Sequence, residues 1–457
     1  MSNEIPDINL PMAEHAQIEF LELVKKIHEQ LLEILDYNEI DILQDQVTDL
    51  NLFLLDQIEK LVNKDAASRT PEINERLRIA LFDEVVGFGP IQPLIRDETV
   101  TDIFVNAPDK IYIERLGLVQ KTNFRFLDEE HILKLVQRVA SKSGRHLDLG
   151  MPYFDSQLSD GSRIHAIIPP VALDGIKVSI RKFQFKKLNI DSLMAGGSIS
   201  PTMAGILKLG VKARFNIIIC GGTGSGKTTL LNSLLTSIQK GERIITIEDT
   251  PELESAHAHT VRLLTRLPNA EDKGAVTQGD LMVNALRMRP DRVILGELRG
   301  SEAFNLLHAM NTGQDGSMVT LHASGAEEAV SRLLNMILMA RYALSAESVR
   351  QQIAGALDLI VYVTRLINGS RRVMAISQVS EENNDIKVED IFRFDIENIT
   401  PEQLQGTFQE MHTAPTKRML SKLVTAGLDK EYLSLIQGNK SHEKLDALLA
   451  HKISDNS

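Results

Sequence analysis

A glycine-rich octapeptide holds the residues best suited to chemistry in this chain. Its sequence is Gly221-Gly222-Thr223-Gly224-Ser225-Gly226-Lys227-Thr228, and Thr229 follows it. An apolar, β-prone run at 215–220 precedes the octapeptide, and a helix-like run at 229–235 follows. A strand, a glycine-rich loop and a helix in this order are the context in which a phosphate-binding loop forms. Because glycine has no Cβ, successive backbone N–H groups can turn toward one phosphate, and the helix N-terminus adds the positive end of its dipole.

Two side chains of the octapeptide have separate expected tasks. Lys227 would reach the terminal phosphates of a nucleotide as a point charge, and the Thr228 hydroxyl would hold Mg²⁺. The residues from Gly221 to Thr229 are therefore predicted to bind ATP and its Mg²⁺ ion. The alternative is a glycine-rich turn that binds nothing, and the flanking strand and helix argue against it.

Three further apolar runs end in side chains that suit phosphate chemistry; they lie at 243–247, 291–296 and 316–321. The first ends in Glu248 and Asp249, the second in Glu297 and the third in His322. In open α/β sheets, ligands bind at the carboxyl ends of the strands, so these groups are expected to meet beside the loop. A carboxylate there can orient or deprotonate a water, or hold Mg²⁺ through one, and His322 can contact the γ-phosphate. Taken singly, each could instead be an ordinary strand terminus.

The composition is that of a globular protein with one cysteine, Cys220, in 457 residues. One cysteine excludes internal disulfides and a four-cysteine zinc site within the chain, and its apolar surroundings predict a buried side chain. His257 and His259 could begin a metal site, but no further ligands accompany them in the sequence. No apolar run reaches the roughly 18 residues of a membrane span, and the acidic N-terminus does not resemble a signal peptide. A cytoplasmic protein is predicted.

The net charge of −12 is concentrated at the start of the chain. Residues 1–69 contain 15 Asp and Glu but only 5 Lys and Arg, so they contribute 5 − 15 = −10. A protein that works mainly on nucleic acid is more often basic, so direct nucleic-acid binding is not expected. The acidic segment is predicted to be a solvated surface, and the alternative is a docking face for a basic partner.

Helical periodicity describes the first part of the chain. Apolar stripes recur at helical spacing across 15–36 and 43–61. A third run begins at Thr70 and Pro71, a cap residue followed by proline in the first turn. We predict an acidic helical segment at 1–69, in which the first two helices form a small bundle. A partner-binding module is the alternative.

Short β-like runs then surround one helix-like stretch, which predicts an α+β domain at 70–185. The runs lie at 101–106, 110–115, 118–124, 157–160, 162–168 and 177–183, and the helix-like stretch at 128–143. A linker is expected at 186–200. Strands and helices alternate from 201 to 395, which is typical of a mostly parallel sheet with crossover helices, and 396–457 is predicted to be a C-terminal helical tail. The expected fold class is α/β: a RecA-like P-loop domain with a parallel sheet, preceded by an α+β domain and an N-terminal helical bundle.

The chain resembles the secretion-superfamily ATPases over about residues 70–395. The segment 247–253 looks like the family's Asp box, 296–300 like its Walker B motif and 320–323 like its His box. Within the superfamily, the chain is most similar to the Tad (Flp-type) pilus assembly ATPases. The stretches that carry this likeness are 160–164, 167–170, 261–266, 285–291 and 309–313. Such long stretches are more specific than the phosphate-binding loop alone.

This resemblance implies a homohexameric ring in which a mobile N-terminal domain closes over the nucleotide. It implies that Arg163 and Arg181 contact the γ-phosphate, where a guanidinium stabilises transition-state charge. It also implies that Glu297 is the catalytic glutamate and that Glu248 assists it. Further candidates, across subunits or within one, are Arg287, Arg289 and Arg299.

The resemblance implies pilus assembly as the task, with retraction as a further task of the same motor. A cytoplasmic hexamer at the inner membrane would act through a platform protein, with only peripheral membrane association. A type IV secretion ATPase that moves protein or DNA–protein substrates is the alternative. The single cysteine argues against the type II secretion branch that carries a four-cysteine zinc element. A RecA-like nucleic-acid motor is a rival from another class, which the acidic balance disfavours. A metabolic P-loop kinase is a further alternative, which the additional N-terminal domain disfavours because such a kinase would not need it.

Overall fold

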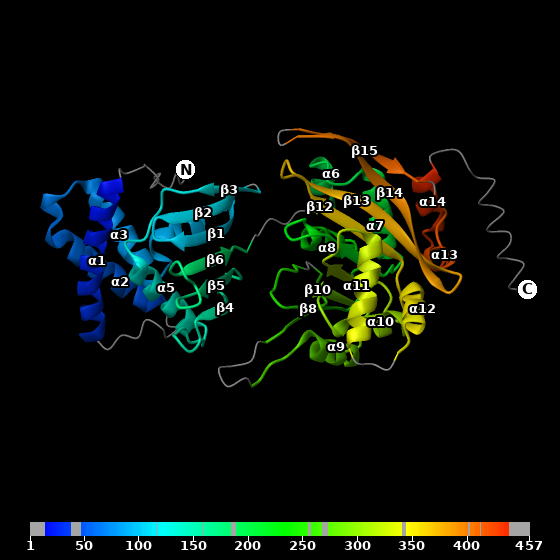
Figure 1. The fold of residues 1–457 in the computed structure, drawn as a ribbon, viewed down its shortest axis with the longest axis horizontal. Coiled ribbons are helices and arrows are strands. Elements are labelled where there is room, and N and C mark those ends of the chain that lie inside the picture. Colours follow the sequence, from blue (N-terminus) through cyan, green and yellow to red (C-terminus); the bar gives the residue numbers. More distant parts are fainter. Residues whose placement is uncertain are drawn as a thin grey trace, which may run out of the picture. The chain divides into compact units, whose positions relative to one another are not determined.

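The computed structural model describes most of the chain, and Figure 1 shows its helices and strands. The described residues are 14–37, 47–115, 117–158, 160–183, 189–254, 257–266, 273–340, 344–400, 403–411 and 413–437. The chain divides into two compact units, Met1–Gln184 and Phe185–Ser457. The N-terminal end at 1–12 and the last residues of the predicted tail lie outside the described residues.

The first unit begins with the helices α1 (Glu14–Tyr37), α2 (Val47–Lys64) and α3 (Pro71–Val85), with the short η1 (Ala66–Ser68) before α3. The Thr70 hydroxyl caps α3 by accepting the N–H of Ile73 at 3.4 Å, as the cap signal predicts. The stripes of these helices share one core, which includes Val24, Leu31, Leu54, Ile58, Leu77 and Leu81. This corrects the predicted division after residue 69, because α3 completes the bundle. A stripe shows that a helix face is buried but not which neighbour covers it.

An antiparallel sheet follows, with its strands in the order β3-β2-β1-β6-β5-β4. Its elements are η2 (Gly89–Ile91), α4 (Gln92–Arg96), β1 (Val100–Ala107), β2 (Lys110–Arg115), β3 (Leu118–Lys121), α5 (Glu129–Lys142), β4 (Tyr153–Gln157), β5 (Arg163–Ile167) and β6 (Lys177–Arg181). Ile103, Val136 and Ile180 belong to the core between α5 and the sheet. The strand predicted at 157–160 is wrong, because β4 ends at Gln157. The chain turns there: Gly161 has a φ angle of +89°, which suits a turn rather than a strand.

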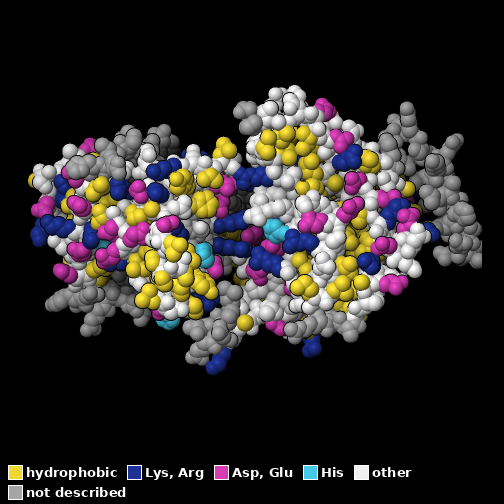
Figure 2. All heavy atoms as spheres, in the orientation of Figure 1, with side chains coloured by type: hydrophobic (Ala, Val, Ile, Leu, Met, Phe, Trp, Pro, Cys, Tyr) yellow, Lys and Arg dark blue, Asp and Glu magenta, His cyan; other side chains and the backbone are white. Residues whose placement is uncertain are grey.

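Exposed apolar side chains lie on the edge strand β4 and on two nearby loops. Leu149, Met151 and Tyr153 precede or begin β4, and Val171 and Leu173 follow β5. Ile168 N–H donates to the carbonyl of Pro152 at 2.8 Å, which brings the two loops together. Figure 2 shows hydrophobic side chains gathered on the surface of this unit. An apolar surface of this kind is typical of a contact site for another protein.

The second unit is built on a mixed sheet with the strand order β15-β14-β13-β12-β7-β11-β10-β8-β9. Six neighbouring strands, β12, β7, β11, β10, β8 and β9, are parallel to one another. On the other side of β12, the strands β13, β14 and β15 continue the sheet in antiparallel pairs. Its strands are β7 (Ile217–Cys220), β8 (Ile244–Glu248), β9 (Thr260–Leu264), β10 (Arg292–Leu298), β11 (Met318–Leu321), β12 (Leu359–Arg365), β13 (Arg371–Glu382), β14 (Asp385–Ile399) and β15 (Leu404–Glu410). The carboxyl ends of β7, β11, β10 and β8 therefore lie side by side.

Helices cover both faces of this sheet (Figure 1). They are α6 (Ile190–Ala195), α7 (Pro201–Lys212), α8 (Lys227–Leu235), α9 (Gln278–Arg287), α10 (Glu302–Asn311), α11 (Ala326–Met339), α12 (Ala346–Ala356), α13 (Lys417–Ala426) and α14 (Asp429–Gln437). Ile217 and Ile219 of β7 pack with α7, α8, α13 and α14, whereas Ile218 and Cys220 pack with α9 to α12. The parallel α/β arrangement confirms the predicted fold class. Burial raises the pKa of the Cys220 thiol to about 12, so this cysteine is the small buried apolar residue that was predicted.

Two predicted segment assignments change in the second unit. The linker expected at 186–200 contains α6, whose Ile190 is buried in the core. The helical tail expected from 396 begins later, because β14 runs to Ile399 and β15 pairs with it along Leu404–Glu410. The physical reason is long-range pairing: side chains of β15 alternate between exposed and partly buried, and the strand is paired along its length with β14.

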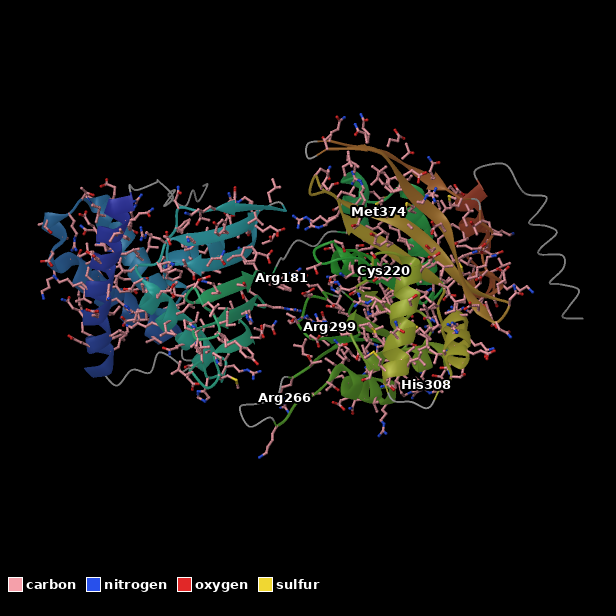
Figure 3. The ribbon with its side chains drawn as sticks, in the orientation of Figure 1. Arg181, Cys220, Arg266, Arg299, His308 and Met374 are labelled. Carbon is pink, nitrogen blue, oxygen red and sulfur yellow. The ribbon has the colours of Figure 1, made fainter. Side chains whose placement is uncertain are left out.

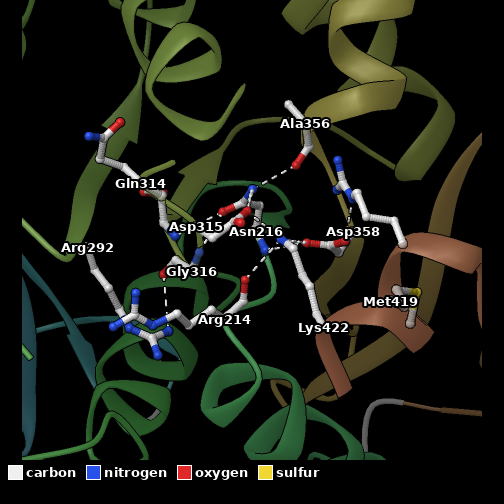
Figure 4. Close-up of polar contacts among 12 residues, drawn as sticks. Arg214, Asn216, Arg292, Gln314, Asp315, Gly316, Ala356, Asp358, Met419 and Lys422 are labelled. Carbon is white, nitrogen blue, oxygen red and sulfur yellow. Dashed lines mark hydrogen bonds and ion pairs between the residues drawn. The ribbon is translucent and has the colours of Figure 1, made fainter. Parts of the chain in front are cut away.

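A buried polar network ties α13 to the sheet (Figure 4). Asp358, which is fully buried before β12, accepts hydrogen bonds from Arg418 Nε, Lys422 Nζ and the backbone N–H of Asn216, each at 2.8 Å. The side-chain oxygen of Asn216 accepts the N–H of Gly316, also at 2.8 Å. Buried charges are tolerated when they are paired and hydrogen-bonded. Helix α13 is therefore an integral part of this unit.

Candidate active site

The predicted phosphate-binding loop lies between β7 and α8, and its glycines occupy positions that need them. Gly224 and Gly226 have φ angles of +69° and +98°, a region that side chains rarely adopt. At Gly221, a Cβ would lie 2.1 Å from the carbonyl oxygen of Val363, so a larger residue would push the loop away from β12. The backbone conformation that a phosphate cradle requires is therefore present.

Lys227 begins α8, and its side chain folds over the loop. The residue is 7% exposed, and its Nζ donates to the carbonyls of Gly221 at 3.0 Å and Gly222 at 2.8 Å. Thr228 and Thr229 follow in the first helical turn and are partly buried. Helix N–H groups, an ammonium and a hydroxyl at one helix N-terminus can bind a phosphate and its cation.

A charged cluster joins the carboxyl ends of β8, β10 and β11. Glu297 has Oε1 3.0 Å from His322 Nε2 and Oε2 2.7 Å from Arg299 Nη2. Arg299, which extends from the end of β10 in Figure 3, also lies 3.3 Å from Asp249 Oδ2. Asp249 accepts a hydrogen bond from the Thr265 hydroxyl at 3.0 Å. The structure thus brings together Glu297, Asp249 and His322, which the strand-end argument predicts.

Electrostatics keep Glu297 ionised. Burial raises its pKa, but the hydrogen bond and charge of Arg299, with the charges of His322 and Lys227, outweigh burial and leave the pKa below its ordinary value. Burial and the Lys227 charge lower the pKa of His322 against the opposing effect of Glu297, so its imidazole is neutral at pH 7 and donates to Glu297. The charge of Lys227 in the loop thus acts on both groups of the cluster. A carboxylate with a lowered pKa is a weak base, so Glu297 is better suited to orient a water than to remove its proton.

Glu248 lies in different surroundings from Glu297. It is 1% exposed, and its Oε1 accepts the N–H of Leu253 at 2.6 Å. Its Oε2 lies 3.9 Å from Arg262 Nη2 and has no hydrogen-bond partner among the described residues. Burial raises the pKa of Glu248 to about 7, although the Leu253 N–H and the Arg262 charge act in the opposite direction. The assisting role of Glu248 in catalysis remains a prediction.

The raised pKa of Glu248 predicts how stability depends on pH. In the unfolded chain the carboxyl ionises near 4.5, whereas in the folded chain it keeps its proton to about pH 7. Its contribution to stability is thus present below about pH 4.5 and is lost as the pH rises to about 7. Glu248→Gln, which is neutral at all pH values, is expected to raise the free energy of unfolding at pH 8 by about 2–3 kcal/mol. Urea unfolding at pH 5 and pH 8 measures this difference.

A matched control for this prediction is Glu327→Gln, because Glu327 is exposed in the first turn of α11. It is expected to change the free energy of unfolding by less than about 0.5 kcal/mol at either pH. Equal effects of the Glu248 and Glu327 substitutions at pH 8 would contradict the assignment of a protonated, buried Glu248.

Arg163 and Arg181 lie in the first unit, where they are cross-strand partners on β5 and β6. Asp102 of β1 lies opposite Arg181 on its other side, so this row of the sheet carries two guanidinium groups beside one carboxylate. Two neighbouring guanidinium groups can share an anion such as a phosphate. The turn before Arg163 is fastened to the end of β6, because the Ser162 hydroxyl accepts the N–H of Phe183 at 3.0 Å. Their contact with a nucleotide remains a prediction.

The three further arginine candidates have different surroundings. Arg299 holds Glu297 within the same chain, whereas Arg287 and Arg289 are exposed at and just after the end of α9. The role of Arg299 as the partner of Glu297 was not predicted from the sequence. A signal was available, because residues two apart along an extended segment point to the same side.

The two histidines that could begin a metal site have other partners in the structure. His257 Nε2 lies 2.8 Å from the carbonyl of Gln239, and His259 Nε2 lies 2.8 Å from Arg243 Nη1. Within the described part of the chain, no group of three or more His, Cys, Asp or Glu could hold a metal ion. The Thr228 hydroxyl fits Mg²⁺, which takes oxygen ligands and usually keeps waters and substrate phosphates in its shell.

Comparisons with known proteins identify the family of this chain. Residues 84–425 match the family model described as type II/IV secretion system protein. One relative is a Mycobacterium tuberculosis protein whose role in conjugal transfer is itself inferred. It is 36% identical over 330 residues, which is 71% of this chain and 93% of the relative. The type IV secretion system protein VirB11 of Brucella suis is 31% identical over 301 residues, which is 60% of this chain and 83% of the relative.

Two solved structures each cover most of the chain. The VirB11 ATPase of Brucella suis, in complex with sulphate, is 28% identical, covers 65% of this chain and 96% of its own, and has a TM-score of 0.35. The pilus retraction motor PilT with bound ADP is 16% identical, covers 79% of this chain and 92% of its own, and has a TM-score of 0.45. In the described residues, no helix is long and apolar enough to cross a membrane. With most of its length matched by the family model, this chain belongs to the type II/IV secretion ATPase family.

Proposed function

We propose that this protein hydrolyses ATP and uses the energy to drive an export or pilus machine at the inner membrane. The observation that carries the proposal is the position of Glu297, held between Arg299 and His322 at the carboxyl ends of β10 and β11. Strand β11 lies between β10 and β7, and β7 leads into the phosphate-binding loop. A carboxylate fixed in this place can align a water with the terminal phosphate of a nucleotide bound by the loop.

The residues of the loop would divide the remaining work. The ammonium of Lys227 neutralises charge on the terminal phosphates, and backbone N–H groups of the loop and of α8 bind the phosphate oxygens. Thr228 would hold Mg²⁺, which supplies further neutralisation when bound. His322 donates to Glu297 and keeps its carboxylate oriented.

Motion would come from the two-unit construction of the chain. In the proposal, Arg163 and Arg181 of the first unit contact the γ-phosphate, so ATP favours closure and hydrolysis releases it. Their cross-strand placement supports this role, because one phosphate can accept from both guanidinium groups. The active form is proposed to be a homohexamer, in which closure of one subunit acts on the next.

The machine that we favour is a Tad-type pilus, in which the ATPase acts on an inner-membrane platform protein from the cytoplasmic side. This choice depends on the long matching stretches in the sequence, such as 160–164 and 285–291. Assembly of the pilus is the proposed direction, and retraction by the same motor is compatible with it. Nucleic acid is not a direct partner in this proposal.

A second candidate is a type IV secretion or conjugal transfer ATPase. The observation that favours it is the relatedness to the Mycobacterium tuberculosis protein and to VirB11 of Brucella suis, whose names place them in such systems. The catalytic residues would be the same, so the partners separate the two candidates.

Affinity purification from the native organism tests the choice. Tagged Glu297→Gln, which is expected to bind ATP without turnover, is purified with ATP from detergent-solubilised membranes, and copurifying proteins are identified by mass spectrometry. We expect a multi-spanning platform protein together with pilus components. Lys227→Ala is the control and should recover less of the ATP-dependent partners. Type IV secretion channel proteins would support the second candidate, and nucleic acid without membrane proteins would contradict both.

A further inference from the structure

The hairpin of β12 and β13 lies directly against the phosphate-binding loop. Arg371, the first residue of β13, donates from Nε to the carbonyl of Gly224 at 2.9 Å. Its Cδ lies 3.2 Å from the position that a Cβ on Gly226 would take. On the preceding strand, the carbonyl of Val363 packs against Gly221. The hairpin therefore contacts the loop at its beginning, its middle and its end.

The hairpin is held in one conformation by strand pairing and by hydrogen bonds in its turn. Arg365 and Arg371 are directly paired across the two strands. The connecting turn is closed by hydrogen bonds from Leu366 N–H to the Ser370 carbonyl at 2.8 Å and from Gly369 N–H to the Leu366 carbonyl at 2.9 Å. The Asn368 side chain also accepts from the Ser370 hydroxyl at 2.7 Å. A side chain on such an element is positioned more accurately than one on an open loop.

The bond to Gly224 acts on the orientation of a single peptide group. The Gly224 carbonyl and the Ser225 N–H belong to one planar trans peptide, so they point in opposite directions. Holding the carbonyl on Arg371 therefore keeps the Ser225 N–H on the other side of the peptide, where it donates to the carbonyl of Gly222 at 3.4 Å and closes a turn of the loop. Gly224 has a positive φ angle, and glycine gives little resistance to a flip of the peptide that joins it to Ser225. A flip would break the turn and change the shape of the loop that a bound phosphate meets.

We propose that Arg371 is a positioning residue that holds the phosphate-binding loop in its nucleotide-binding conformation. The proposal rests on the proposed function, because it assumes that the loop binds a nucleotide. Strand β12 flanks β7 on the side away from β11, so Arg371 approaches the loop from the side opposite Glu297 and His322. Its effect therefore falls on the binding of ATP and ADP alike and not on the hydrolytic step.

Three substitutions of Arg371 distinguish the contribution of its Nε–H donor from the contribution of its positive charge. In Gln the amide nitrogen is attached to Cδ, as Nε is in Arg, so Arg371→Gln keeps a donor at that place and loses the charge. Arg371→Lys keeps a charge but places the ammonium one bond further along the side chain. Arg371→Met loses both. The matched control is Arg372→Met, because the neighbouring Arg372 donates instead to the carbonyl of Gly196 at 3.1 Å.

Dissociation constants for a fluorescent ADP and for ATP, with kcat measured alongside, test the proposal on the full-length protein. Arg371→Met and Arg371→Lys are expected to raise both dissociation constants about tenfold with kcat within about twofold, whereas Arg371→Gln and Arg372→Met stay within about threefold of wild type. Thermal unfolding without nucleotide shows that each variant is folded. Binding restored by Lys but not by Gln, or unchanged binding in Arg371→Met, would overturn the proposal. A wild-type protein that binds no nucleotide would instead refute the proposed function itself.

Discussion

Replacing Glu297 with Gln is expected to lower kcat for ATP hydrolysis by about 10³-fold while ATP affinity stays within about threefold of wild type. Gln has nearly the same size but no charge, so it orients the attacking water poorly and leaves Arg299 without its nearest carboxylate. Glu297 is only partly buried at the open end of β10, so the protein should keep its fold. Steady-state phosphate release and equilibrium binding of fluorescent ATP measure the two quantities.

Two further variants complete this test. Lys227→Ala is expected to weaken ATP binding and to lower turnover at least about 100-fold, because the ammonium contributes to both ground state and transition state. Glu327→Gln, an exposed glutamate on α11, should leave both quantities unchanged. Normal turnover in Glu297→Gln or in Lys227→Ala would remove the basis for the site assigned here.

Replacing Asp358 with Ala is expected to lower the free energy of unfolding of the second unit by about 3–5 kcal/mol. The substitution leaves Arg418, Lys422 and the backbone N–H of Asn216 without the buried carboxylate that accepts from all three. The loss acts on β7, on β12 and on α13 together (Figure 4). Urea unfolding followed by circular dichroism, with limited proteolysis near α13, measures the effect.

The control for this prediction is Asp385→Ala. Asp385 also forms an ion pair, with Arg350 at 3.5 Å, but its side chain is 72% exposed. Exposed pairs contribute about 0–1 kcal/mol, so only a small change is expected. A change below about 1 kcal/mol in Asp358→Ala would mean that the network in Figure 4 is not a stabilising anchor.

Local signals explain what could be predicted about the elements. The cap and proline at Thr70 and Pro71 begin α3, and the polar turn at Asn383 and Asn384, both with positive φ angles, joins β13 to β14. Long-range pairing explains the errors. Residues 404–410 form β15 because β14 lies beside them, and α3 joins the bundle because α1 and α2 cover its stripe.

The sequence by itself determined the chemistry of the site, because phosphate binding needs particular residue types at short, fixed spacing. Gly221 to Thr228 lie on one continuous stretch, and the strand-end positions of Glu297 and His322 follow from their apolar runs. Only the tertiary structure decided which charged groups touch. It joined Arg299 to Glu297, enclosed Glu248 and set Arg371 against Gly224, a residue 147 positions earlier in the chain. Such contacts depend on strand order and side-chain packing, and neither is encoded in the local periodicity of the sequence.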